Sequence, residues 1–256
     1  YSFKTDVQKL KLEEILAGQD LPLKVLGNVE GTMSLSGAGF DPAAALNNLK
    51  GGGNLKVTDG KLVDFNLLKS ALNKIALIPD LVTRVEDNLP EKYKDVFNEK
   101  DTYLRNVIFE AKIQDGGAEI TKAVVETDGF FLSGNGRYGF DQNIRMAGAL
   151  TIPQDLSAAM GASVEELKFL FDDAGQIYIP ISPYEGPLGE IRILPDLEYL
   201  GKRIILNKGT SDLEDLINKA LGIEKEEGQS QDGQPSSEQN PGRELIKGVL
   251  DSILGK

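Results

Sequence analysis

Apolar and polar residues alternate along much of the chain, and this alternation predicts β-strands. The clearest case begins at Val107, where Phe109, Ala111 and Ile113 continue one face while polar residues such as Glu110 occupy the other. Successive side chains of a strand point to opposite faces, so this segment has one apolar and one charged face.

Three more segments of this kind follow directly along the chain. They cover residues 118–127, 130–140 and 143–152. Asp-Gly or Asp-Gln pairs, which are typical of tight turns, separate them. In the last segment Ile144, Met146 and Leu150 share one face. We therefore expect four consecutive strands in an antiparallel meander, with an apolar face that is either buried or covered by a ligand.

Shorter strands are expected before the meander. Residues 1–7 and 29–37 alternate between apolar and polar side chains. Residues 54–60 and 61–65 flank the pair Asp59-Gly60, which predicts a β-hairpin.

One more strand is expected after the meander, at residues 176–181. Ile177 and Ile179 share a face there, and Pro180 lies between Ile179 and Ile181. Proline has no N–H to donate to a neighbouring strand, so this strand is predicted to lie at a sheet edge or to end there.

Apolar residues at helical spacing predict short amphipathic helices around these strands. The expected helices cover residues 11–17, 43–49, two stretches between 67 and 89 on either side of Pro79, 91–97, 156–160, 164–171 and 212–221. Asp41 and Pro42 supply an N-cap and a first turn for the second of them. Together the patterns predict an α+β fold rich in β-structure: a curved antiparallel sheet with an apolar face, flanked by short amphipathic helices.

The domain organisation follows from composition. We expect one β-rich domain over residues 1–222, a disordered acidic linker over 223–242 with few apolar side chains, and an amphipathic helix over 243–256. The chain begins at Tyr1 inside a predicted strand, without a signal-like segment, and we expect a fragment of a longer protein.

Composition excludes several classes of function. The 256 residues contain no histidine and no cysteine, so imidazole or thiolate catalysis, zinc clusters and disulfides are excluded. The net charge of −12 repels nucleic acid and anionic membrane surfaces. No apolar run reaches the roughly 18 residues that a bilayer span needs. We expect no nucleic-acid partner, no cofactor and no bound metal.

Acidic pairs are the remaining candidates for catalysis. Glu165-Glu166, Asp172-Asp173 and Asp128 are available for a carboxylate-based hydrolase, which needs two facing acids. Among 40 acidic residues such pairs are common on solvated surfaces, so we assign no catalytic residue and expect no enzyme. Gly134 and Gly136 lie within a predicted strand, where glycine marks a bulge or the close approach of another backbone or a ligand.

Three stretches of the sequence resemble the C-terminal region of the AsmA-like family. They are Ala45–Phe65, the pair Tyr103–Asp115 and Val124–Gly136, and Gly175–Pro180 followed by Ile193–Leu197. The resemblance covers about residues 25–205 and lies in the order and spacing of these stretches. Residues 79–100 and 182–190 depart from the family pattern.

This resemblance implies a bacterial envelope protein with a β-rich body in the periplasm. An N-terminal helix outside this sequence would anchor it in the inner membrane. The family is linked to phospholipid movement between the membranes and to outer-membrane assembly, and its sheets are thought to form an apolar groove.

We therefore expect a non-catalytic protein that binds phospholipid or another acyl lipid in an apolar β-groove, with other envelope proteins as further partners. The candidate groove residues lie in three predicted strands: Val107, Phe109, Ala111, Ile113, Ile144, Met146, Leu150, Ile177 and Ile179. Periodicity alone leaves open whether the helices cover this face completely, in which case it is a plain core. The alternative function is an envelope scaffold or adhesion module that binds protein or glycan through strand edges.

Overall fold

The computed structural model describes residues 1–18, 21, 23–39, 41–75, 78, 80–87 and 89–208. The predicted helix at 212–221, the linker at 223–242 and the helix at 243–256 lie outside these residues.

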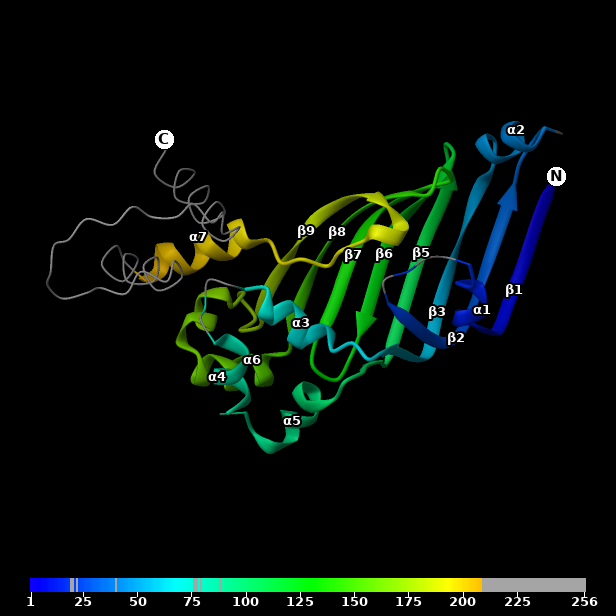
Figure 1. Cartoon of the computed structure of the whole chain (residues 1–256). Helices are drawn as coiled ribbons and strands as arrows, with labels where there is room; N and C mark the ends of the chain where they lie inside the picture. Colours follow the sequence, from blue (N-terminus) through cyan, green and yellow to red (C-terminus); the bar gives the residue numbers. More distant parts are fainter. Residues whose placement is uncertain are drawn as a thin grey trace, which may run out of the picture.

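The described residues form one antiparallel sheet of nine strands (Figure 1). The strands are β1 (Ser2–Lys11), β2 (Lys24–Ser36), β3 (Lys50–Val63), β4 (Thr102–Leu104), β5 (Asn106–Gln114), β6 (Gly117–Glu126), β7 (Phe131–Gly139), β8 (Asn143–Ile152) and β9 (Ile177–Pro187). Their order is β1-β2-β3-β5-β6-β7-β8-β9, and β4 pairs with β3. The sheet is not closed, since β1 and β9 lie at opposite ends of this order. Strands β5 to β8 confirm the predicted meander, and β9 confirms the edge position that Pro180 predicts.

Short helices complete the fold and confirm the predicted α+β class. They are α1 (Leu12–Ile15), α2 (Pro42–Asn47), α3 (Leu67–Asn73), α4 (Leu81–Glu86), α5 (Glu91–Asn98), α6 (Gln154–Ser163) and α7 (Leu197–Lys208), with 3₁₀ helices η1 (Glu165–Leu170) and η2 (Leu188–Glu190). Figure 1 shows α3, α4, α5 and α6 gathered at one end of the strands rather than spread over the sheet.

The predicted hairpin at Asp59-Gly60 is wrong, because β3 runs through this pair as one strand. Asp59 adopts a φ of 52°, and the pairing of β3 with β2 shifts register there, which defines a β-bulge. Val57 and Leu62 are five positions apart and would face opposite sides of a regular strand, yet both are buried in the core. The bulge brings both to the same face, and this burial favours a continuous strand over a turn.

The hydrophobic core lies where the helices meet the sheet. Leu150, Ile152 and Ile177 of the sheet pack in one cluster with helical residues such as Leu72 and Leu156. Buried Ser157 joins the layers, since its hydroxyl donates to the carbonyl of Ile152 at 2.8 Å and accepts from the N–H of Ile177 at 2.8 Å. The helices are thus fixed firmly at one end of the sheet.

Candidate functional site: the apolar face of the sheet

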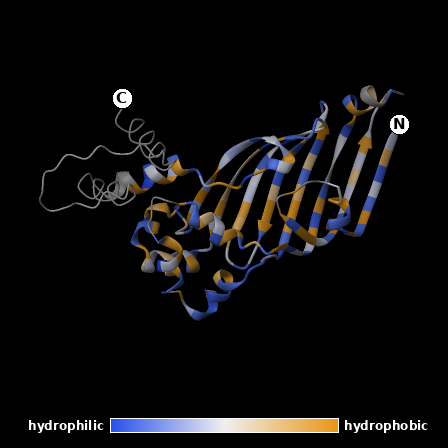
Figure 2. Cartoon of the chain, in the orientation of Figure 1, coloured by the Kyte–Doolittle hydropathy of each residue, from blue (hydrophilic) through white to orange (hydrophobic). Residues whose placement is uncertain are grey.

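The strand register aligns apolar residues across the whole sheet. Residues directly opposite each other on neighbouring strands point to the same side. Such pairs link every strand of the path in turn: Phe3 with Leu35, Met33 with Gly53, Leu55 with Phe109, Phe109 with Ala123, Val125 with Leu132, Leu132 with Leu150 and Leu150 with Ile179. We call the side that carries these residues the apolar face. Figure 2 shows the underlying alternation as bands of hydrophobic and hydrophilic residues along each strand.

One part of the apolar face is covered by the helices. This covered part comprises Val29, Val57, Val107, Leu150, Ile152, Ile177 and Ile179, all of which belong to the core cluster. Leu150, Ile177 and Ile179 have no exposed surface. Among the nine groove candidates from the sequence, Val107, Leu150, Ile177 and Ile179 are therefore core residues, and Ile144 is also buried at 7% exposure.

The other part of the apolar face retains exposed surface. This open part comprises Phe3, Met33, Leu35, Leu55, Phe109, Ala111, Ile113 and Met146. Phe3 is 55% exposed and Leu55 is 40% exposed, while the other six are partly buried. Four of the sequence candidates, Phe109, Ala111, Ile113 and Met146, lie here. The sequence candidates are therefore divided between a core and an accessible surface.

An apolar pocket lies at the border between the two parts. Its volume is about 160 Å³, and its walls include Phe109, Leu132 and Met146 from the sheet. The facing wall is formed by Ile191 and Ile193, which belong to residues 188–196, a segment we call the strap. In Figure 1 the strap leaves the end of β9 and runs back over the sheet to α7.

Hydrogen bonds hold the strap in place over the sheet. The N–H of Leu188 donates to the carbonyl of Gln142 at 3.2 Å, and the N–H of Ser182 donates to the carbonyl of Leu194 at 2.8 Å. Next to the strap, the N–H of Asp196 donates to the carbonyl of Pro180 at 2.8 Å. Backbone bonds of this kind give the pocket a fixed wall.

The floor of the pocket has no side chains at two positions. Gly134 of β7 and Gly148 of β8 are directly paired, and both line the pocket. A Cβ atom at Gly148 would lie 2.4 Å from the carbonyl oxygen of Ser133, so only glycine fits this backbone. The glycines within the predicted strands therefore mark close backbone approach and leave a hollow between Leu132 and Met146.

Sequence reasoning missed the strap and Leu132 as pocket residues. Leu132 alternates with its neighbours in the predicted strand and belongs to the same face as Leu150. Ile191 and Ile193 also alternate, but the segment is too short to reveal which surface it packs against. The sequence shows that these residues are apolar, but it does not show that they lie beside the pocket.

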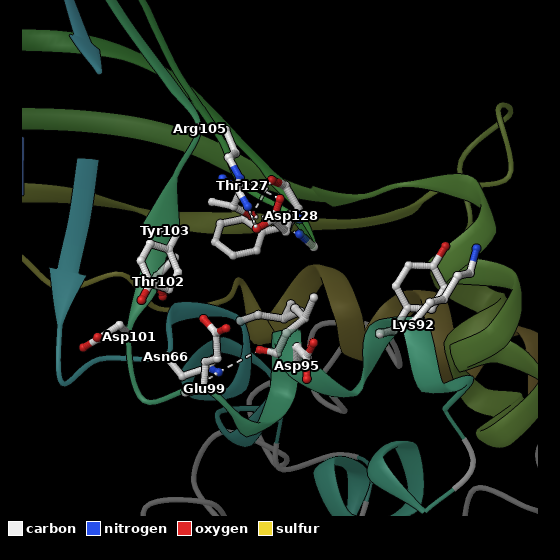
Figure 3. Close-up of a pocket in the computed structure, with 15 residues that line it drawn as sticks. Asn66, Lys92, Asp95, Glu99, Asp101, Thr102, Tyr103, Arg105, Thr127 and Asp128 are labelled. Carbon is white, nitrogen blue, oxygen red and sulfur yellow. Dashed lines mark hydrogen bonds and ion pairs between the residues drawn. The ribbon is translucent and has the colours of Figure 1, made fainter. Parts of the chain in front are cut away.

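A second, polar pocket of about 420 Å³ lies between α5 and the turn that follows β6 (Figure 3). Arg105 donates hydrogen bonds of 2.8 and 2.7 Å to the two carboxylate oxygens of Asp128, which raises the pKa of Arg105. Asp101 forms an ion pair of 2.5 Å with Lys61, whose hydrogen bond lowers the pKa of the Asp101 carboxyl. A general acid needs a raised pKa, so the lowered pKa of the Asp101 carboxyl does not suit a glycosidase acid.

Two of the other acidic candidates, Glu166 and Asp172, also have partners. Glu166 forms an ion pair with Arg84 at 3.1 Å, and the Asp172 carboxylate accepts from the N–H groups of Ala174 and Gln176 at 2.9 Å in a local turn. In the part of the chain that the structure describes, no three acidic residues are placed to hold a metal ion together. Nor does any helix among these residues have the length and apolarity to cross a membrane.

A comparison with known protein families gives a match for the N-terminal half of the sheet. Residues 1–123 match the AsmA family. The matched residues contain β1 to β5 and the first part of β6, and they include most of the open part. The resemblance expected over about residues 25–205 is confirmed up to residue 123, and the match also extends back to residue 1. Beyond residue 123 it stays a prediction. No curated protein and no solved structure matches the chain.

Proposed function

We propose that this protein is a non-catalytic protein of the bacterial envelope that binds acyl chains on the open part of its apolar face. Through this binding it contributes to phospholipid transport between membranes or to outer-membrane assembly. The proposed compartment is the periplasm, with anchorage in the inner membrane through a segment outside this sequence. The observation that carries the proposal is an AsmA family domain whose apolar face is only partly covered by helices.

Energetics favour a long apolar ligand on this surface. Burying a methylene group contributes about 0.8 kcal/mol, so a dozen methylenes contribute roughly 10 kcal/mol before ordering costs. The eight strands of the main path span roughly 34 Å at the usual strand spacing. The pocket of about 160 Å³ is smaller than a typical ligand cavity of about 300–1,000 Å³. It therefore holds one section of an acyl chain, and the rest lies along the open part.

The direct test is lipid extraction and native mass spectrometry of Phe109→Asp and Ile108→Asp variants. Phe109 lines the apolar pocket, whereas Ile108 is its neighbour in β5, is also partly buried, and faces the opposite side of the sheet. A carboxylate at position 109 must lose its hydration when a lipid binds, so Phe109→Asp is expected to abolish acyl lipid binding while Ile108→Asp retains it. Circular dichroism establishes that both variants are folded. Equal lipid content in both folded variants contradicts the proposal.

A second candidate function is a scaffold that binds protein or glycan through a strand edge. It is favoured by β1, whose outer edge has no partner strand among the described residues and whose Phe3 is 55% exposed. Lipid extraction of the unmodified protein separates the two: acyl lipid is expected for the groove and none for the scaffold.

A further inference from the structure

Arg192 differs from every other arginine in the described part of the chain. The other five each have a partner: Arg84 with Glu166, Arg105 with Asp128, Arg137 with the carbonyl of Asp115, Arg145 with Glu185, and Arg203 with the carbonyl of Phe171. Arg192 makes no hydrogen bond or ion pair with any described residue. Arg192 is an exposed residue, so a ligand can reach it.

Arg192 also lies beside the apolar pocket. It lies in the strap between Ile191 and Ile193, and all three residues line the apolar pocket. No other lysine, arginine, aspartate or glutamate lines this pocket. The backbone bonds at Leu188 and Leu194 fix the strap on both sides of Arg192, so the backbone that carries this cation is held beside the pocket.

We propose that Arg192 binds the phosphate of a phospholipid headgroup whose acyl chain occupies the apolar pocket. This inference rests on the proposed acyl-chain binding and adds the chemistry of the headgroup. The planar guanidinium matches two phosphate oxygens at once. The protein as a whole carries a net charge of −12 and repels anions, so a bound phosphate needs a local cation at the pocket. The apolar pocket can bind the acyl chain of an anionic lipid, and the unpaired arginine beside it can bind the phosphate.

The test compares two amphiphiles that share a twelve-carbon chain, dodecyl phosphate and dodecyl maltoside, below the concentrations at which they form micelles. Isothermal titration calorimetry of the full chain is expected to show about tenfold tighter binding of dodecyl phosphate, equivalent to about 1.4 kcal/mol. Arg192→Gln is expected to remove this preference and leave the affinity for dodecyl maltoside unchanged. Lys112→Gln is the matched control, because Lys112 is an exposed cation on the opposite side of the sheet.

Each outcome decides between explanations. If Arg192→Gln keeps the tenfold preference, or Lys112→Gln loses it equally, the role of Arg192 is wrong while acyl-chain binding stands. If neither amphiphile binds the unmodified chain, the proposed function itself fails. Millimolar inorganic phosphate is expected to leave dodecyl phosphate bound, and full displacement would identify a site for free phosphate instead of a lipid headgroup.

Discussion

The covered and open parts of the apolar face share one sheet and one sequence pattern but have different surroundings. In the covered part, Leu150 and Ile177 are fully buried beneath helices. In the open part, Phe3 and Leu55 are 55% and 40% exposed, although their side chains lie on the same apolar face of the sheet. Alternation therefore determines which residues share a face, and the placement of the helices determines which of them become core. The first part stabilises the fold, and the second is available to a ligand.

Truncation of a side chain in each part should separate these roles most strongly. Leu150→Ala is expected to lower the free energy of unfolding by about 2–5 kcal/mol, because it leaves a cavity in a packed core. Leu55→Ala is expected to change it by about 1 kcal/mol or less, because this side chain is already 40% exposed. Urea denaturation measures both. Similar losses would mean that the open part is as well packed as the core.

The next largest change in the free energy of unfolding is expected at Ser157, which connects α6 with the sheet. Ser157→Ala removes the hydroxyl that accepts from the buried N–H of Ile177, and it is expected to cost about 1–3 kcal/mol. Ser163→Ala is the control, because among the described residues the Ser163 hydroxyl bonds within α6 alone, to the carbonyl of Ala159. A Ser157 variant as stable as the Ser163 variant would contradict the proposed role of Ser157 in joining the layers.

The bulge in β3 predicts a smaller effect. Asp59 has a positive φ, which β-branched residues tolerate poorly, so Asp59→Val is expected to destabilise the fold by about 1–2 kcal/mol. Asp59→Gly is expected to be close to neutral, since glycine adopts this conformation readily. Thermal unfolding of the two variants supplies the comparison, and equal stabilities would be inconsistent with the bulge.

The polar side of the sheet should give the smallest effect. The hydrogen bond from Arg145 lowers the pKa of the exposed Glu185 carboxyl below its ordinary value of 4.5. A lowered pKa means that the stabilisation is present above pH 4.5 and is lost as the pH falls through the folded-state value. Glu185→Gln is therefore expected to change stability only slightly near neutral pH and to leave lipid binding intact. A strong loss of lipid would place the ligand on the wrong side of the sheet.

Much of this architecture was predictable from sequence because β-structure repeats every two residues. The meander, the short helices and the common face of Phe109 and Ile113 all follow from local periodicity. The prediction of a hairpin at Asp59-Gly60 was wrong because the burial of Val57 and Leu62 against distant elements outweighed the local turn preference. Likewise, whether Leu150 or Phe109 is covered depends on helices far away in the sequence, and Ile191 joins the pocket only through the path of the strap.

A brominated acyl chain and a single tryptophan test the central claim most directly. The protein contains no tryptophan, so Phe109→Trp and Phe131→Trp each introduce one reporter, the first on the apolar face and the second on the opposite side. A phospholipid brominated along its acyl chain is expected to quench the fluorescence of the tryptophan at position 109 and to spare the one at position 131. Equal quenching at both positions, or quenching at position 131 alone, would contradict acyl-chain binding on the open part of the apolar face.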